Sequence, residues 1–189
     1  MLKNVSVILL GIRFLLGPIL LAGAWDGETG WWFSAGLFVG LLTDILDGMA
    51  ARRFGGGSER LREWDSRVDV FFVLCVLLSA LAAHAEVLAE LVQPLALVFG
   101  LHLLSILVPW LKFRRLPAFH AYSAKLAGLA MFAGAVELFS TAGAGVFFWL
   151  AIVAAAVSHL DRLAIGLLLP EWQTDVRGFW AAIEKRTSG

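Results

Sequence analysis

The sequence predicts an all-α, polytopic membrane protein whose six transmembrane helices form one bundle. First, 60% of its 189 residues are hydrophobic, and the mean hydropathy of +0.82 is too high for an ordinary soluble domain. Second, apolar runs of about 20 residues, the length that crosses a bilayer, recur along the chain. Third, Lys and Arg are absent from alternate connecting loops, as the positive-inside rule describes.

Each apolar run is bounded by polar or turn-forming residues, which gives six expected spans in order. They cover residues 5–25, 32–53, 66–84, 87–111, 120–140 and 145–169. The first is too long for a signal-peptide core and lacks a small-residue cleavage site. We therefore expect a catalytic transmembrane domain at 1–170 and a cytoplasmic or interfacial tail helix at 171–189.

The loops near 25–32, 84–90 and 140–145 contain no Lys or Arg, whereas the opposite loops are rich in both. This asymmetry predicts that both termini face the cytoplasm. The alternation fits six spans and fails for five or seven. The expected location is the inner, cytoplasmic membrane of a bacterium. The single Cys75 excludes a disulfide framework and a thiolate metal site.

Four aspartates stand at one cytoplasmic edge of the predicted bundle, in the segment 41–74. Asp44 and Asp47 share a helix face at the end of one span, and Asp65 and Asp69 share a face at the start of the next. The short connection between the spans predicts a helical hairpin in which the four carboxylates converge. Clustered carboxylates repel one another, and divalent cations such as Mg²⁺ or Mn²⁺ relieve that repulsion. The alternative is ordinary pairing with nearby arginines: Arg52, Arg53, Arg62 and Arg67.

These residues resemble the CDP-alcohol phosphotransferase family, whose members carry D-x2-D-G-x2-A-R and then G-x3-D-x3-D. The stretch "DILDGMAAR" (Asp44–Arg52) matches every defined position of the first half, and "DSRVD" (Asp65–Asp69) matches the end of the second. Leu61 stands where the family has glycine. The resemblance implies a homodimeric membrane enzyme that transfers a phosphatidyl group from CDP-diacylglycerol to a small alcohol and releases CMP.

Carried over to this chain, the resemblance makes Asp44, Asp47 and Asp65 ligands of two divalent cations. Asp69 becomes both a ligand and the catalytic general base. Three small or basic residues of the first half would face the CDP moiety: Gly48, Ala51 and Arg52.

A second polar set consists of the cations Arg13, Lys125 and Arg162, which lie inside predicted spans. Ionisable residues within a membrane are costly and are functional candidates by default. Because all three are cations, we expect them to bind a phosphorylated acceptor. "R-x4-P" (Arg13–Pro18) resembles the first span of phosphatidylglycerophosphate synthases, which favours glycerol 3-phosphate.

The alternative acceptors are inositol phosphate, inositol or another alcohol. Two more remote functions also use acidic residues in membranes: an intramembrane prenyltransferase and a divalent-ion transporter. The prenyltransferases resemble bundles of about nine spans with two distant aspartate motifs, and a transporter would place carboxylates near the midplane. We expect membrane lipids and no nucleic acid among the partners.

Overall fold

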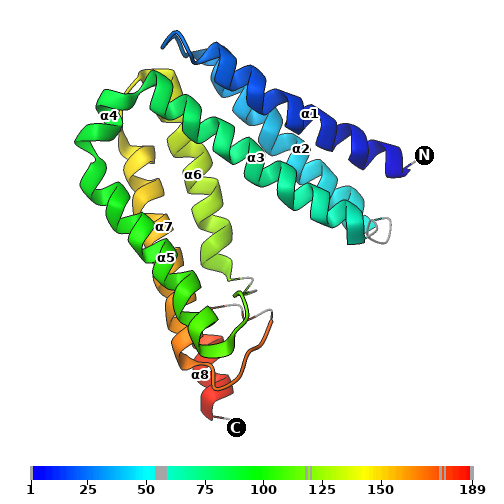
Figure 1. Cartoon of the computed structure of the whole chain (residues 1–189), viewed down its shortest axis with the longest axis vertical. Helices are drawn as coiled ribbons and strands as arrows, with labels where there is room; N and C mark the ends of the chain where they lie inside the picture. The colour runs from blue at the N-terminus through cyan, green and yellow to red at the C-terminus, as the bar shows by residue number, and fades with distance from the viewer. Residues whose placement is uncertain are drawn as a thin grey trace. The chain divides into compact units, whose positions relative to one another are not determined.

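The computed structural model describes residues 2–53, 59–117, 119, 121–174, 176 and 178–187. Over these residues the chain forms helices and no strand, which confirms the all-α prediction (Figure 1). The described helices are α1 (Leu2–Gly23), α2 (Trp31–Arg53), α3 (Glu59–Ala83), α4 (Ala85–Glu90), α5 (Val92–Phe113), α6 (Tyr122–Thr141), α7 (Val146–Leu168) and α8 (Phe179–Thr187).

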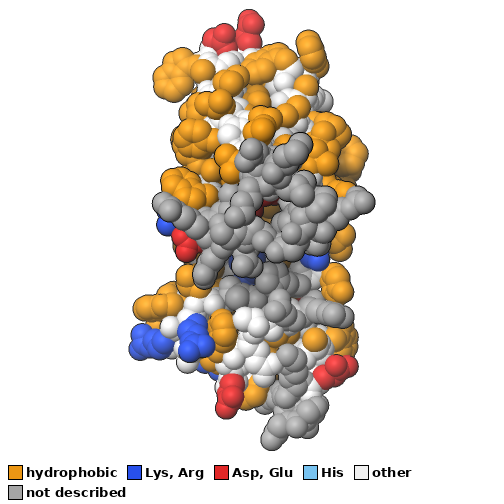
Figure 2. All heavy atoms as spheres, turned by 90° about the vertical axis from the view of Figure 1, so that its right-hand side faces the viewer, with side chains coloured by type: hydrophobic (Ala, Val, Ile, Leu, Met, Phe, Trp, Pro, Cys, Tyr) orange, Lys and Arg blue, Asp and Glu red, His pale blue; other side chains and the backbone are white. Residues whose placement is uncertain are grey.

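Five of these helices, namely α1, α3, α5, α6 and α7, are long and apolar enough to cross a membrane. Large hydrophobic side chains are exposed along all five, and hydrophobic atoms cover much of the described surface in Figure 2. The protein is therefore an integral membrane protein. Helix α2, at 23 residues, is the expected sixth span but is not one of the five. The count of six spans and the side on which the termini lie remain predictions.

Four expected spans agree with α1, α2, α6 and α7 to within three residues at each end. The other two differ for local reasons. Helix α3 begins at Glu59, earlier than the expected span. Its first turns are polar, so the apolar run used for the prediction did not include them. The expected span at 87–111 is divided at Leu91, between α4 and α5. Pro94 explains this division, because its ring clashes with the carbonyl four residues earlier, at Glu90.

The chain divides into two compact units. Unit 1 comprises Met1–Leu88 with Leu138–Gly143, and its helix α1 packs against both α2 and α3. Small residues allow this close packing. A Cβ on Gly17 of α1 would lie 3.1 Å from the Sγ of Cys75 in α3, which leaves little room for a larger residue. The three helices lie side by side in Figure 1, with the acidic ends of α2 and α3 together.

Unit 2 comprises Ala89–Glu137 with Ala144–Gly189. Helices α5 and α7 pack together, and α8 packs back against α7. The tail contributes Val176 and Ala182, which are buried, to a core that also includes Ile165 and Leu169. The expected tail helix is therefore present as α8 and is packed within this unit. The division of the chain at residue 170 stays a prediction.

Two charged side chains of unit 2 connect its helices through hydrogen bonds. The Nζ of Lys112 donates hydrogen bonds to three carbonyls at the C-terminal end of α7, those of Gly166, Leu167 and Leu169. Asp161 of α7 accepts one hydrogen bond from the Ser123 hydroxyl of α6 and another from the backbone N–H of Phe179 in α8. Asp161 therefore ties α6 and the tail helix to α7.

Candidate active site

The candidate site lies within unit 1, where three helices each contribute charged side chains. Helix α2 carries Asp44 and Asp47 near its C-terminal end, and α3 carries Asp65 and Asp69 near its N-terminal end. Helix α1 contributes Arg13, which is only 2% exposed. Helical spacing within each pair, together with the packing of α1 against both helices, brings the charges together.

The guanidinium of Arg13 lies at the point where three of the carboxylates converge. Its Nη1 is 3.4 Å from Oδ1 of Asp44 and 3.5 Å from Oδ1 of Asp65. The same nitrogen donates a hydrogen bond to Oδ1 of Asp69. The convergence predicted from the sequence is therefore present for three aspartates, and the side chain at its centre is an arginine from another helix.

Asp47 is the most buried of the four aspartates, at 7% exposure. Its Oδ1 is buried and has no hydrogen-bond partner among the described residues, and the same is true of Oδ1 of Asp65 and Nη2 of Arg13. An unpartnered buried carboxylate oxygen is costly. The cluster therefore contains acceptor capacity that the described protein groups do not use.

The chemistry of the cluster fits a hard divalent cation, since carboxylate oxygens are the preferred ligands of Mg²⁺ and Mn²⁺. As the side chains stand, no three His, Cys, Asp or Glu residues in the described part of the chain form a ready metal site. The Nη1 of Arg13 occupies the point between three of the carboxylates. The two-cation site stays a prediction.

The sequence did not reveal the partner of Arg13 or the role of Thr43. Thr43 is 5% exposed. Its Oγ1 accepts from Nε of Arg13 at 3.5 Å and donates to the carbonyl of Gly40 at 2.8 Å. Arg13 was expected to bind the acceptor. The signal in the sequence was an arginine within a predicted span. The sequence does not show which residues of a neighbouring helix such an arginine contacts.

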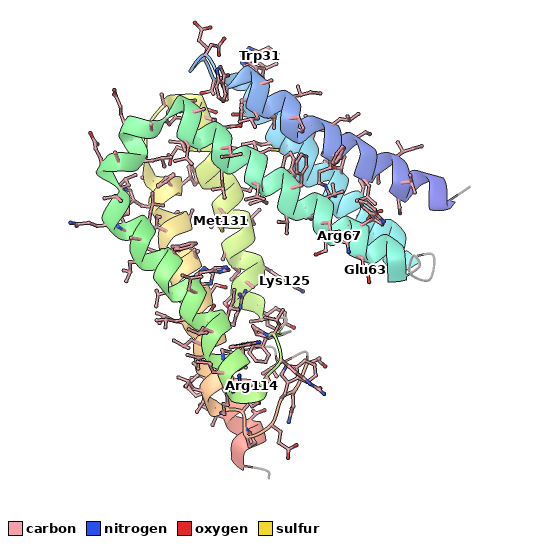
Figure 3. The ribbon with its side chains drawn as sticks, in the orientation of Figure 1. Trp31, Glu63, Arg67, Arg114, Lys125 and Met131 are labelled. Atoms are coloured by element: carbon pink, nitrogen blue, oxygen red, sulfur yellow. The ribbon has the colours of Figure 1, made fainter. Side chains whose placement is uncertain are left out.

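Of the nearby arginines that could instead pair with the aspartates, Arg67 is the one whose side chain the structure describes. Its guanidinium lies 4.0 Å from the carboxylate of Glu63, one turn earlier on the exposed surface of α3, and the two are labelled in Figure 3. It also lies over the ring of Trp64. The described ion pair of Arg67 is therefore with Glu63. The side chains of Arg53 and Arg62 lie outside the described residues. The surroundings of the three residues expected to face CDP, Gly48, Ala51 and Arg52, also lie outside what the structure describes.

The other two cations of the expected acceptor site belong to unit 2. Lys125 is an exposed side chain of α6 whose Nζ lies 5.7 Å from the centre of the Tyr122 ring (Figure 3). Arg162 is a half-buried residue of α7. In the same helix, His159 stacks edge-on against His102 of α5 at 4.8 Å between ring centres. The grouping of Arg13, Lys125 and Arg162 stays a prediction.

Apolar helices long enough to span a membrane and a partly buried cluster of carboxylates define a polytopic helical membrane protein with an acidic site. The chain belongs to the CDP-alcohol phosphatidyltransferase family, whose model matches residues 3–160. The chain matches none of the curated proteins and none of the solved structures with which it was compared.

Membership of this family makes the protein an enzyme, a transferase of substituted phosphate groups. The family transfers a phosphatidyl group from a CDP-alcohol to an alcohol acceptor in phospholipid synthesis, and it is generally dependent on divalent metals. The match includes all four aspartates and Arg13. The resemblance inferred from the aspartate motif is therefore confirmed at the level of the family.

Proposed function

We propose that this enzyme transfers the phosphatidyl group of CDP-diacylglycerol to glycerol 3-phosphate, with two bound Mg²⁺ or Mn²⁺ ions. The acceptor hydroxyl oxygen forms a bond to the lipid-side phosphorus, the pyrophosphate P–O bond breaks, and CMP leaves. The observation that carries the proposal is the convergence of Asp44, Asp65 and Asp69 on one point beside the unpartnered oxygen of Asp47.

Each aspartate has a distinct role in this proposal. Asp44, Asp47 and Asp65 hold the cations, while Asp69 both holds a cation and takes the proton of the attacking hydroxyl. The bound ions would neutralise the pyrophosphate and stabilise the leaving oxygen. Asp44 is 55% exposed and Asp69 is 39% exposed, so neither carboxylate is enclosed by the described part of the protein.

Further parts of the proposal follow the family resemblance. The residues that would face the CDP moiety are Gly48, Ala51 and Arg52. The enzyme acts as a homodimer in the inner membrane of a bacterium, with its active site on the cytoplasmic side. That side supplies the soluble acceptor and receives CMP, while the acyl chains of the donor remain in the bilayer.

The direct test is CMP release by the purified enzyme from CDP-diacylglycerol. We expect release to require Mg²⁺ or Mn²⁺ and to be lost on chelation. Asp69→Asn should lower kcat by about 100-fold or more, as the loss of a general base does. Glu63→Gln is the matched control, because it removes an exposed carboxylate from the same helix. Turnover of Asp69→Asn close to wild type would exclude the assigned base.

The acceptor is tested with a panel of glycerol 3-phosphate, inositol phosphate, inositol and other alcohols in the same assay. Three cations are proposed to bind the acceptor phosphate: Arg13, Lys125 and Arg162. Lys125→Met should therefore raise the acceptor KM by about 10- to 150-fold, the value of a charge-assisted hydrogen bond, and leave the KM for CDP-diacylglycerol unchanged. A wild-type preference for inositol, or an unaltered acceptor KM in the variant, would refute the phosphorylated acceptor.

A further inference from the structure

Arg13 is a buried cation placed among several carboxylates. At 2% exposure it has almost no access to solvent, and an arginine in that position is stable only when anions compensate its charge. Its compensation comes from Asp44, Asp65 and Asp69, all through the single atom Nη1. Arg13 is thus the counter-charge of the aspartate cluster among the described side chains.

This pairing leaves both partners incompletely satisfied. One guanidinium contacts three aspartates. Three buried atoms of the cluster have no hydrogen-bond partner among the described residues: Nη2 of Arg13, Oδ1 of Asp47 and Oδ1 of Asp65. An ion-pair network with a purely structural role would hydrogen-bond those atoms, because a buried polar atom without a partner is costly. The cluster is therefore arranged to accept more positive charge than Arg13 provides.

The position of Nη1 is incompatible with a cation bound at the same point. Mg²⁺ sits about 2.0–2.1 Å from its oxygen ligands, and larger divalent ions sit only slightly farther away. An ion held jointly by Asp44, Asp65 and Asp69 would occupy the space between the oxygens that Nη1 now contacts. The guanidinium and such an ion exclude each other by size and by charge.

We propose that Arg13 and divalent cations compete for the same carboxylates, so that a cation binds by displacing Arg13 from Asp44, Asp65 and Asp69. This inference rests on the proposed metal-dependent function. Other attachment of the guanidinium is weak, since the contact of Nε with Thr43 is 3.5 Å long. Displacement also makes the guanidinium available to an anionic group of a substrate. Arg13 thus stabilises the aspartate cluster when no metal is bound and leaves the carboxylates when a metal binds.

Mn²⁺ binding by purified protein in detergent, measured by electron paramagnetic resonance, tests the displacement without any turnover. Arg13→Met should bind Mn²⁺ about 10-fold more tightly than wild type or better, because the ion no longer competes with a charge-assisted hydrogen bond. Arg13→Lys keeps the charge but replaces the planar guanidinium with a compact ammonium group, so its affinity should lie between the two. Arg67→Met is the matched control, since Arg67 pairs with Glu63 outside the cluster, and its affinity should equal that of wild type.

Thermal unfolding supplies a second measurement. With chelator, Arg13→Met should unfold at a lower temperature than wild type, because its aspartates have lost their counter-charge. Saturating Mn²⁺ should then raise its unfolding temperature by more than it raises that of wild type. A variant that folds only in Mn²⁺ and unfolds on chelation would give the same result in its extreme form.

Two outcomes would overturn the inference alone. Mn²⁺ affinity in Arg13→Met equal to or weaker than that of wild type would show that no competition exists. Tighter binding in Arg13→Met with Arg13→Lys identical to wild type would show a field effect of the charge without displacement. Wild-type protein that binds no Mn²⁺ and releases CMP without metal would instead overturn the proposed metal dependence, and the inference with it.

Discussion

Lys112 offers a quantitative test of how unit 2 is held together. Its Nζ donates to the carbonyls of Gly166 at 3.2 Å, Leu167 at 2.7 Å and Leu169 at 2.7 Å. These carbonyls belong to the C-terminal end of α7, where no backbone N–H of the helix is left to bond to them. A positive charge there also interacts favourably with the helix dipole. Lys112→Met removes the charge and all three hydrogen bonds while keeping most of the apolar stem.

The expected cost follows from the surroundings of each carbonyl. Gly166 and Leu169 are buried, whereas Leu167 is exposed and water can replace its lost bond. An orphaned buried acceptor costs about 1–3 kcal/mol. Because the Lys112 side chain is itself exposed, water reaches part of the vacated space, and we take the lower end for two carbonyls, about 2 kcal/mol in total. For a chain of this length that corresponds to a fall of about 4–8 °C in the unfolding temperature.

The assay is thermal unfolding in detergent, with Arg114→Met as the matched control. Arg114 carries the same charge two residues later, is exposed, and lies over the ring of Trp110. The control should lower the unfolding temperature by less than about 2 °C, as surface substitutions usually do. Equal unfolding temperatures for the two variants would refute the capping role of Lys112 and would favour a contact with lipid headgroups for the whole basic segment.

Two further predictions concern polar contacts away from the aspartates. Asp161→Ala should release α8 and make the tail more sensitive to protease, because Asp161 accepts hydrogen bonds from Ser123 and Phe179; unchanged cleavage of the tail would contradict this. Burial lowers the pKa of His84, whose Nε2 lies 2.9 Å from the Thr29 hydroxyl. The unfolded state therefore binds the proton more readily, so the unfolding temperature should fall as the pH drops below about 6.5. His84→Gln should show a flatter profile between pH 5 and 8.

Much of the fold could be predicted because it follows from local properties of the chain. Apolar runs gave the positions of α1, α2, α6 and α7 to within three residues, and the helical spacing of the aspartates gave their shared faces. Hydrophobic length did not reveal the break at Leu91, since Pro94 lies in an otherwise apolar segment. It also did not reveal the polar first turns of α3.

The site was only partly predictable because its central contact joins residues far apart in the sequence. Asp69 and Arg13 are 56 residues apart, and their meeting depends on how α1 packs against α3. The sequence shows that Arg13 is an expensive residue within a span, but not which charge stabilises it. A phosphate group of the acceptor and a carboxylate of the protein satisfy an arginine by the same chemistry, so the residue type alone did not choose between them.

Several described charges of this membrane protein bind backbone groups at helix ends. The carboxylate of Glu137 accepts from the backbone N–H of Phe148 at the start of α7, and Lys112 and Asp161 likewise bind backbone groups at helix ends. These charges complete helix termini, and their role is structural. Arg13, Asp47 and Asp65 are different, because each keeps a buried atom without a hydrogen-bond partner among the described residues. Since such atoms are costly, a ligand that completes them fits the proposed function. Within the described part of unit 1 all three of these side chains belong to one cluster, and in the proposed function a cation and the pyrophosphate of a CDP-lipid would together provide the missing contacts.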